Sequence, residues 1–529
     1  MTAIPVPPSP ADSPPESRHA PHTTREPTPA VAVRRGYETL HGDDKRVITR
    51  FFGVGGDVRA RKVISRVARL PEAEVSRLLA EVHADFEARH RDIEDKFERN
   101  FNQIKRLVPD ADFISRDRRL LLGSYFTMEY SIESAALFNP SIVPHPDQTG
   151  CPKSAVRFIM SLRATGEGHV SSIVFRTGIL THEGDVQLDP PSHYAAKMRV
   201  RQDRSYEKKL FFLKLIEMAA YSDAARVVLD ELPQYFTFEQ LQHKLREVRE
   251  RPARPSPFSE TEDNMLWLAR SNYHIDTPPK TTPQEIVIFP TSENETRGIE
   301  DCRLTPFRHD DGKLTFFGTY TAYNGFRVLP QLLETRDFHS FEIHTLNGKY
   351  VQNKGMALFP RMIDGLYHMI GRLDGENMFL MRSDNPHFWN EAVKLIGPVY
   401  PWEFVQIGNC GPPIETDRGW LLLTHGVGPM RRYCIGVNLL DLDDPSKVIA
   451  HLPQPLIVPG EEERNGYVPN VVYSCGALAH GDTLLIPYAV SDSASTFATL
   501  SISQLLDALV RTSTQCPVPE VNHANHTQA

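Results

Sequence analysis

Two segments of the chain place apolar residues at helical spacing. Residues 71–108 set Val75, Leu79 and Val82 three or four positions apart, which predicts one face of an amphipathic helix. Residues 205–250 repeat this spacing, and their charges alternate in sign as on a solvated helix face. Neither segment carries a recognisable catalytic motif, so we expect them to serve packing or oligomerisation.

The rest of the chain has the pattern of short strands. From about residue 260, apolar runs such as EIVIFP, KLTFFGTYTAY and GWLLLTHGV alternate with turn residues, and helical spacing nearly vanishes. A polar-Asp-aromatic motif recurs near Ser271, Asp337, Asp384 and Asp443. A period of roughly 50 residues suits a four-stranded propeller blade, and about five blades fit the available length. A β-sandwich is the alternative, and the recurring motif favours the propeller.

These patterns predict a mainly β protein, a five-bladed β-propeller with N-terminal and inserted α-helical segments. Residues 1–35 are rich in proline and poor in large apolar side chains, as in disordered tails. After this tail we expect a helical N-terminal region over residues 36–124 and the propeller over residues 125–510. We expect a helical insertion within the propeller over about 205–255 and a disordered C-terminal tail over 511–529.

Composition and charge exclude several classes of protein. The 529 residues include 67 acidic and 59 basic ones, a net charge of −8 that argues against a nucleic-acid partner. No apolar run approaches the roughly 18 residues that a membrane span requires. The six cysteines form no CxxC pair, and the histidines form no helical ligand pair, so we expect no metal or organic cofactor. The absence of an apolar signal region favours the cytoplasm.

The candidate chemistry lies at the ends of predicted strands. In GIEDCR, Glu300 and Asp301 stand beside Arg303, an arrangement that can hold one carboxylate ionised while burial raises the pKa of the other. A salt-bridged turn is the structural alternative. Lys354 precedes an apolar strand, and Arg372 lies inside one, where it needs an anionic partner or an open channel.

Seven motifs occur in a particular order along the chain. They are NPSI at Asn139, GIEDCR, TYTAYN at Asn324, KGMALFP, IGNCGPP, GWLLLTHGV and PNVVYSCG. This series resembles glycoside hydrolase family 130, the β-mannoside phosphorylases and β-1,2-mannosidases, over residues 125–200 and 260–510. The Pro-rich tail and the helical segments lie outside the compact core of that family.

The resemblance implies an inverting reaction on a β-mannoside in the funnel of a five-bladed propeller. Asp301 is then the acid, relaying a proton through a mannosyl hydroxyl while inorganic phosphate attacks and α-mannose 1-phosphate leaves. The partners implied are an oligosaccharide and phosphate. The substrate-binding residues implied are Glu300, Arg303, Asn139, Tyr323, Asn324, Tyr467 and Asp492. The phosphate-binding positions implied are Lys354, Arg372, Gln406 and His425.

Gln406 replaces a lysine of the phosphorylases and so removes one positive charge from the implied phosphate pocket. Loss of basic groups is also how members of this family become hydrolases, and a hydrolase needs a carboxylate base to activate water. Glu403, Glu376 and Asp374 are the candidates for that base. We therefore expect a phosphorylase, with a β-1,2-mannosidase as the alternative. A catalytically silent sugar-binding propeller is disfavoured because it has no need of an acid at position 301.

Overall fold

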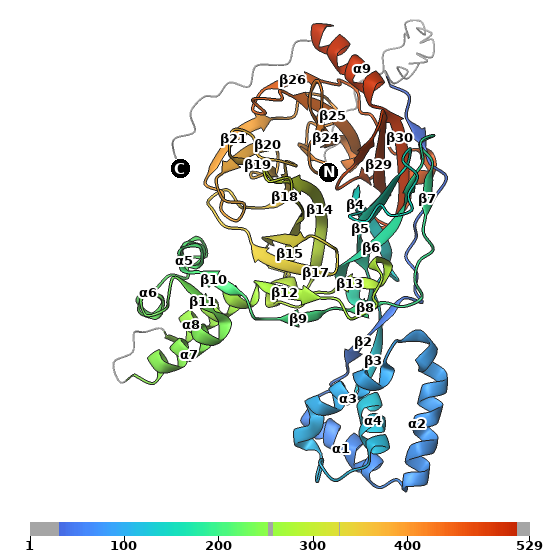
Figure 1. The fold of residues 1–529 in the computed structure, drawn as a ribbon, viewed down its shortest axis with the longest axis vertical. Helices are drawn as coiled ribbons and strands as arrows, with labels where there is room; N and C mark the ends of the chain where they lie inside the picture. The colour runs from blue at the N-terminus through green and yellow to red at the C-terminus, as the bar shows by residue number, and fades with distance from the viewer. Residues whose placement is uncertain (1–30, 252–257, 327, 516–529) are drawn as a thin grey trace, which may run out of the picture.

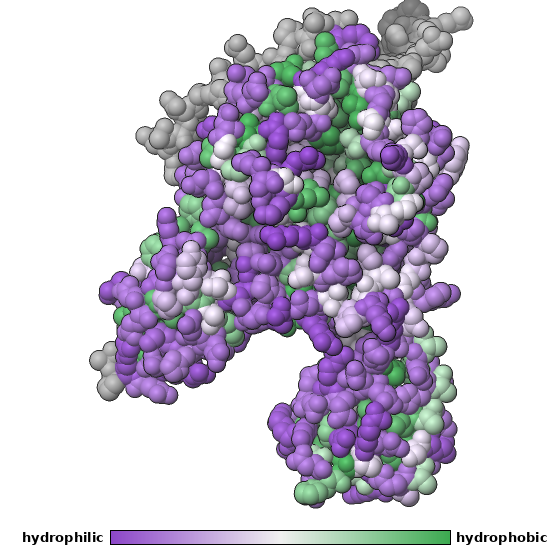
Figure 2. Space-filling model, in the orientation of Figure 1, coloured by the Kyte–Doolittle hydropathy of each residue, from purple (hydrophilic) through white to green (hydrophobic). Residues whose placement is uncertain are grey.

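The computed structural model describes residues 31–251, 258–326 and 328–515, and the fold is mainly β with helical segments. Figure 1 shows the sheets arranged around a common centre, with two helical units projecting from one side. Hydrophilic residues cover most of the face seen in Figure 2, including both helical units. Among the described residues, no helix is long and apolar enough to span a bilayer.

The largest sheet consists of two mainly antiparallel groups that share one residue pair. Gly298 of one group pairs with Ser171 of the other, and the remaining pairings of the strand Gly298–Arg308 are to the strand Leu314–Tyr323 alone. The first group comprises β4 (Ala136–Pro144), β5 (Val156–Thr165), β6 (Ser171–Leu180), β7 (Val186–Leu188), β8 (Ala196–Lys197) and β13 (Ile286–Ile288). The second group comprises β14 (Gly298–Arg308), β15 (Leu314–Tyr323), β16 (Val328–Thr335), β17 (Ser340–Thr345), β12 (Tyr273–Asp276) and β9 (Arg199–Arg201).

Three further antiparallel sheets follow along the chain. One comprises β18 (Lys354–Leu358), β19 (Tyr367–Arg372), β20 (Met378–Ser383) and β21 (Glu391–Ile396). The next comprises β22 (Gln406–Asn409), β23 (Ile414–Thr416), β24 (Gly419–Val427), β25 (Tyr433–Leu440) and β26 (Val448–His451). The last comprises β27 (Val472–Tyr473), β28 (Leu478–His480), β29 (Thr483–Val490), β30 (Ala494–Ser501) and β1 (Arg34–Arg35).

The recurring sequence motif marks equivalent turns in three sheets. Asp337, Asp384 and Asp443 lie between β16 and β17, between β20 and β21, and between β25 and β26, each just before the next strand outward. Ser271 differs, because it follows a helix and precedes β12. The repeat found in the sequence therefore corresponds to a repeated position in space for three of its four members.

The helical units have their own apolar clusters. The N-terminal unit packs around residues such as Val75, Phe101 and Leu121, and the inserted unit around Leu215, Val228 and Leu245. The N-terminal unit contains α1 (Asp57–Ala68), α2 (Glu72–Phe86), α3 (Ile93–Ile104) and α4 (Arg116–Tyr125), with β2 (Val47–Phe51) paired to β3 (Thr127–Ser131). The inserted unit contains α5 (Lys208–Glu217), α6 (Asp223–Asp230), α7 (Phe238–Arg249) and α8 (Phe258–Arg270), with β10 (Ser205–Glu207) paired to β11 (Tyr235–Thr237).

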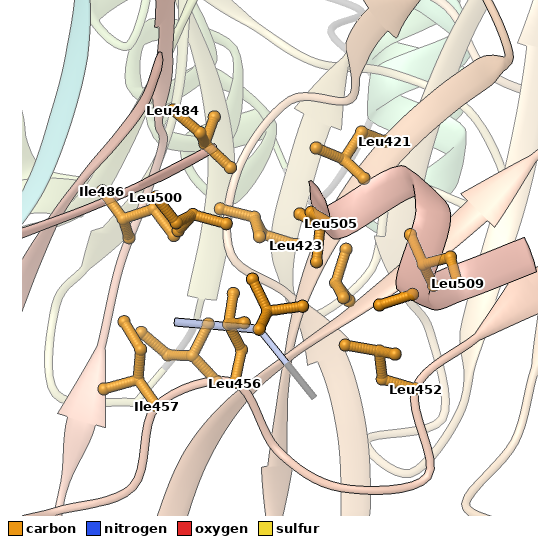
Figure 3. Close-up of a cluster of buried hydrophobic side chains, with 14 of the residues drawn as sticks. Leu421, Leu423, Leu452, Leu456, Ile457, Leu484, Ile486, Leu500, Leu505 and Leu509 are labelled. Carbon is orange, nitrogen blue, oxygen red and sulfur yellow. The ribbon is translucent and has the colours of Figure 1, made fainter. Parts of the chain in front are cut away.

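Three expectations about boundaries need correction. Val31 is buried and Arg34–Arg35 pairs with β30, so the described chain joins the fold before residue 36. The inserted unit continues through α8, beyond residue 255, because Met265 and Leu268 complete its apolar cluster. The C-terminal helix α9 (Ile502–Gln515) runs past residue 510. Its Leu505 and Leu509 pack against leucines of β24 and β29 (Figure 3), and this burial accounts for its presence. Residues 1–30 and 516–529 lie outside the described residues.

Candidate active site

Asp301 lies at a β-bulge in the inner strand β14. The pairing of β14 with β15 shifts register between Glu300 and Arg303, and Asp301 has a φ of 55°. A bulge places an extra residue on one strand and redirects its side chain, and bulges are frequent beside active sites. At this bulge the Asp301 side chain departs from the regular alternation of side chains between the two faces of the sheet.

Asn139 occupies the matching position in the neighbouring inner strand β4. The pairing of β4 with β5 shifts between Phe138 and Ser141, and Asn139 has a φ of 50°. Its Nδ2 donates to Oδ1 of Asp301 over 2.5 Å. Ser141 Oγ accepts a hydrogen bond from the backbone N–H of Leu304 at 2.9 Å, which ties the two strands together. Two bulges therefore place the amide against the carboxylate.

Glu300 is held between two cations. Its Oε1 accepts from Arg163 Nη2 at 2.8 Å, and its Oε2 accepts from Lys354 Nζ at 2.7 Å. Arg163 also approaches Asp301, with 3.7 Å between Nη1 and Oδ1. Adjacent carboxylates repel each other, and these shared cations offset that repulsion. Lys354 thereby reaches the site, although Glu300 already engages its ammonium group.

The electrostatic surroundings of Asp301 favour the ionised form. Burial disfavours that form, but the charges of Arg163, Arg303 and Lys354 and the Asn139 hydrogen bond outweigh burial, so the pKa of Asp301 is lowered. Asp492 lies close enough to interact with Asp301, and its pKa is raised to about 6 by burial and by that negative charge. The site therefore holds two carboxyl groups with pKa values shifted in opposite directions.

A small cavity of about 30 Å³ lies beside Asp301. Three of the lining side chains are basic, and Asp301 is the only carboxylate among the described lining residues. Such a set of charges suits an anion, because arginine and lysine donate to phosphate-type oxygens. The lining residues are Asp301, Arg303, Lys354, Gly355, Arg372, Gly408, Asn409, His425 and Tyr473.

His425 positions Arg372 at this cavity. Its Nδ1 lies 3.2 Å from the carbonyl oxygen of Asn409, and its Nε2 lies 3.4 Å from Arg372 Nη1. Burial and the two nearby arginines lower the pKa of His425 to about 3, so the ring is neutral at neutral pH. Its Nδ1–H then donates to the carbonyl, and Nε2 accepts from Arg372. In this arrangement His425 acts on Arg372, and its place among the phosphate-binding residues stays a prediction.

Glycine at position 408 makes room for that imidazole. A Cβ atom there would lie 2.4 Å from Cε1 of His425, a distance that side chains do not tolerate. The ring also stacks on Tyr433, with ring centroids 5.7 Å apart. Gln406, two residues earlier on β22, donates from Nε2 to the Tyr433 hydroxyl at 3.4 Å and does not line the cavity. Gln406 thus contacts the tyrosine that stacks on His425.

Arg303 is buried and lines the cavity. Its Nε donates to Asn409 Oδ1 at 3.2 Å, its Nη1 donates to the backbone oxygen of Asp301 at 3.2 Å, and its Nη2 donates to the hydroxyl of Tyr473. These three bonds fix the guanidinium and join β14, β22 and β27. Arg303 therefore organises the site and adds positive charge to it.

The remaining predicted residues lie farther from the cavity. Tyr323 pairs with Gly298 where β14 begins, and its hydroxyl donates to Gly325. Asn324 accepts from the backbone N–H of Phe326 in the following turn. Tyr467 is 69% exposed, and its ring stacks on His169 at 5.7 Å. None of these three lines the cavity, and their role in substrate binding remains a prediction.

Sequence analysis did not assign a role to Arg163, Asn409 or Tyr473. Arg163 interrupts an apolar strand, VRFIMSLRAT, which was the available signal for a paired or catalytic arginine. Asn409 and Tyr473 lie inside motifs that we considered, but each reaches the site from a different sheet. Their convergence depends on how the sheets meet, which a single strand pattern does not encode.

Two of the candidate hydrolytic bases have structural roles. Glu403 is buried, and its Oε1 accepts from the backbone N–H groups of Val399 and Tyr400. Asp374 Oδ1 accepts from the backbone N–H groups of Glu376 and Asn377. Both carboxylates therefore stabilise turns. None of the three candidates lines the described cavity.

Comparisons with known proteins agree with these motifs. The profile of glycoside hydrolase family 130, described as beta-1,4-mannooligosaccharide phosphorylase, matches residues 269–511. A 1,2-beta-oligomannan phosphorylase of Thermoanaerobacter is 32% identical over 223 residues, which cover 40% of this chain and 72% of that protein. The chain belongs to glycoside hydrolase family 130.

Two further similarities involve the bacterium Listeria innocua. Its beta-1,2-mannobiose phosphorylase is 31% identical over 237 residues, which cover 43% of this chain and 65% of that protein. The match thus spans less than two thirds of the length of that relative. A solved structure of the Listeria innocua enzyme with beta-1,2-mannobiose aligns with a TM-score of 0.42 at 21% identity, covering 72% of this chain and 93% of that one.

Proposed function

We propose that this protein is an inverting β-mannoside phosphorylase that acts on β-1,2-linked manno-oligosaccharides. The observation that carries the proposal is the cavity beside Asp301, where Arg303, Lys354 and Arg372 surround a space with no other carboxylate among the described lining residues. An inverting hydrolase requires a carboxylate base near the attacking water, whereas phosphate requires only positive charge to hold and orient it. The relatives named above are themselves phosphorylases of β-1,2-mannosides.

The reaction follows from these charges. A phosphate oxygen attacks the anomeric carbon as the glycosidic bond breaks, and the departing sugar oxygen takes a proton that Asp301 supplies through a mannosyl hydroxyl. The products are α-mannose 1-phosphate and a sugar shortened by one mannose. In the unliganded protein the pKa of Asp301 is lowered by nearby cations. Bound phosphate offsets those cations, so it raises that pKa and favours the protonated acid.

We further propose that the five strand groups form the blades of a five-bladed propeller. The inner edges are β4, β14, β18, β22 and β27, and four of them contact in succession: β4 with β14, β14 with β18, and β18 with β22. Only one residue pair connects β6 to β14 among the described residues, so we divide the largest sheet into two blades at this point. Asn139, Asp301, Lys354, Asn409 and Tyr473 come from the five inner strands in turn. The helical units are additions outside this propeller.

The decisive experiment measures turnover of β-1,2-mannobiose with and without inorganic phosphate, with the products resolved by anion-exchange chromatography. Mannose 1-phosphate formed only when phosphate is present supports phosphorolysis. Free mannose released at a rate independent of phosphate overturns it and identifies a β-1,2-mannosidase. Gln406 is the observation that favours this second function, because it supplies no charge where the phosphorylases have a lysine. Sugar binding without turnover would identify a silent sugar-binding protein.

A further inference from the structure

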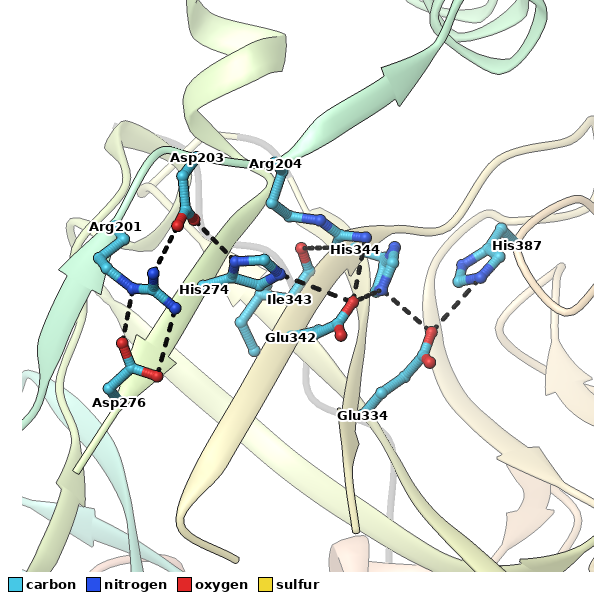
Figure 4. Close-up of polar contacts among 10 residues, drawn as sticks. All are labelled: Arg201, Asp203, Arg204, His274, Asp276, Glu334, Glu342, Ile343, His344 and His387. Atoms are coloured by element: carbon cyan, nitrogen blue, oxygen red, sulfur yellow. Dashed lines mark hydrogen bonds and ion pairs between the residues drawn. The ribbon is translucent and has the colours of Figure 1, made fainter. Parts of the chain in front are cut away.

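A second polar cluster lies on the outer strands, away from Asp301. Glu334 on β16, His344 on β17 and His387 in the turn before β21 each direct one possible ligand atom to a common point (Figure 4). Those atoms lie within 4.8 Å of one another. The imidazole rings of the two histidines are 4.2 Å apart between centroids. Nothing in the proposed reaction uses this cluster.

Two of the three distances within the cluster match the edges of a tetrahedral coordination shell. Glu334 Oε1 lies 3.1 Å from His344 Nε2 and 3.3 Å from Nε2 of His387. Bonds of about 2.0–2.1 Å to a tetrahedral zinc ion place neighbouring ligand atoms about 3.3 Å apart. A metal ion therefore fits among these atoms with little movement of the side chains.

Hydrogen bonding does not account for the close approach. Glu334 Oε1 and His344 Nε2 are buried and lack a hydrogen-bond partner within the described structure, even though they lie 3.1 Å apart. His387 Nδ1 is likewise buried without a partner. Unpaired buried polar atoms cost about 1–3 kcal/mol each, so a group that satisfies Glu334 Oε1 and His344 Nε2 together is expected.

The two neighbouring carboxyl groups at the cluster also favour a bound cation. Glu334 and Glu342 are directly opposite each other in the β16–β17 pairing, an unfavourable arrangement for two carboxylates. Arg204 pairs with Glu342 at 3.3 Å, but the ion pairs of Glu334 within the described residues involve only the two histidines. A cation bound beside Glu334 would reduce the repulsion between these two carboxylates.

We propose that Glu334, His344 and His387 bind one divalent transition-metal ion of the zinc type. Two imidazole nitrogens and one carboxylate oxygen form a ligand set that zinc accepts. The fourth position faces Glu342, whose Oε2 lies 3.5 Å from His344 Nε2, or water in the adjoining cavity of about 200 Å³. Because its ligands come from two neighbouring sheets, the ion stabilises their contact and takes no part in the sugar chemistry.

The backbone around the ligands is already fixed. Asn347 Nδ2 donates to the carbonyl oxygen of His387 at 3.0 Å, and the His387 N–H donates to Asn385 Oδ1 at 2.9 Å. Lys214 of the inserted unit donates to the carbonyl oxygen of Leu346 nearby. The site therefore needs no refolding to accept a metal. Sequence analysis did not find these ligands, because they come from two strands and a turn and we looked for histidine pairs on one helix.

The test uses the full chain, stripped with a chelator and then dialysed against Zn²⁺ or Co²⁺. We expect one retained metal equivalent per chain by mass spectrometry of the metal, visible d–d bands of tetrahedral Co²⁺, and a rise in melting temperature on loading. The double variant His344→Ala/His387→Ala should lose the bound metal equivalent. This loss is larger than the roughly 10–100-fold weakening of metal affinity caused by removing a group that only supports a ligand. His243→Ala, an exposed histidine of α7, is the matched control and retains the metal.

Two outcomes would overturn the proposal. One is a wild-type chain that retains no metal, or whose Co²⁺ form has the weak spectrum of an octahedral ion. The other is retention of the same equivalent by the double variant, which would show that metal binds elsewhere. The Co²⁺ spectrum of the wild type decides the matter even if the double variant fails to fold.

Discussion

Asn139 and Asp301 occupy equivalent bulges in two adjacent inner strands, and a hydrogen bond of 2.5 Å joins their side chains. Both residues have positive φ, 50° and 55°, a conformation that costs free energy for any residue other than glycine. Strain of this kind persists only where the surrounding structure enforces it, and it is concentrated at functional sites. The pair therefore marks the place where we propose that the chemistry occurs.

Replacing Asp301 by asparagine should strongly reduce turnover and leave the fold intact. The amide keeps the size and the tolerance of positive φ but cannot supply a proton, so we expect kcat to fall by about 10²–10⁴-fold. Steady-state kinetics on β-1,2-mannobiose with phosphate measure the loss, and circular dichroism verifies folding. The matched control is Asp311→Asn, in the exposed turn between β14 and β15, and it should keep full activity. Unchanged kcat in D301N would refute the acid assignment.

Arg372→Ala should weaken the use of phosphate. Removing a charge-assisted hydrogen bond costs about 1.5–3 kcal/mol, which corresponds to a rise in KM for phosphate of roughly 10–150-fold. Varying phosphate at saturating mannobiose measures the effect. Arg382→Ala serves as the control, because Arg382 lies on the next strand, β20, and is exposed. Equal phosphate KM values in R372A and the wild type would remove Arg372 from the pocket.

Gln406→Lys should lower KM for phosphate, because it returns a positive charge to a position close to the cavity. The expected gain is modest, about tenfold or less, since Gln406 contacts Tyr433 and does not line the cavity. Gln352→Lys adds the same charge at an exposed site and should change nothing. A higher phosphate KM in Q406K would contradict the correspondence drawn between Gln406 and the phosphorylase lysine.

Asp492 should make the protein less stable as pH rises. Its folded-state pKa is raised to about 6 by burial and Asp301, above its value of about 3.9 in the unfolded chain. The folded state then binds more protons, so this contribution to stability is complete below about pH 4 and is lost as pH rises through about 6. Asp492→Asn removes the dependence and raises the free energy of unfolding at about pH 8 by up to about 3 kcal/mol.

Urea unfolding at several pH values measures this effect. Asp364→Asn is a suitable control, because Asp364 also has positive φ, 50° against 51° for Asp492, but is exposed. The control should retain the pH dependence of the wild type. If D492N also retains it, the titrating group lies elsewhere.

The sequence alone determined the features that repeat locally. Alternating apolar residues predicted a mainly β chain, and helical spacing predicted the segments that became α2, α3 and α5–α7. These two structural inferences succeeded because strand and helix periodicity depend on neighbours within one element. The GIEDCR motif singled out Asp301, whose role as the acid stays a prediction. Helix α8 was missed because its apolar face is completed only by α5–α7, so tertiary packing stabilises it.

Only the tertiary structure decided which side chains meet. Arg163, Asn409 and Tyr473 reach the site from different sheets, and His425 faces Arg372 because glycine at 408 leaves room for its ring. Glu334, His344 and His387 converge in the same way from two sheets. Each of these meetings depends on the register and packing of strands that are distant in the chain, and the periodicity of one element carries no information about its partners in space.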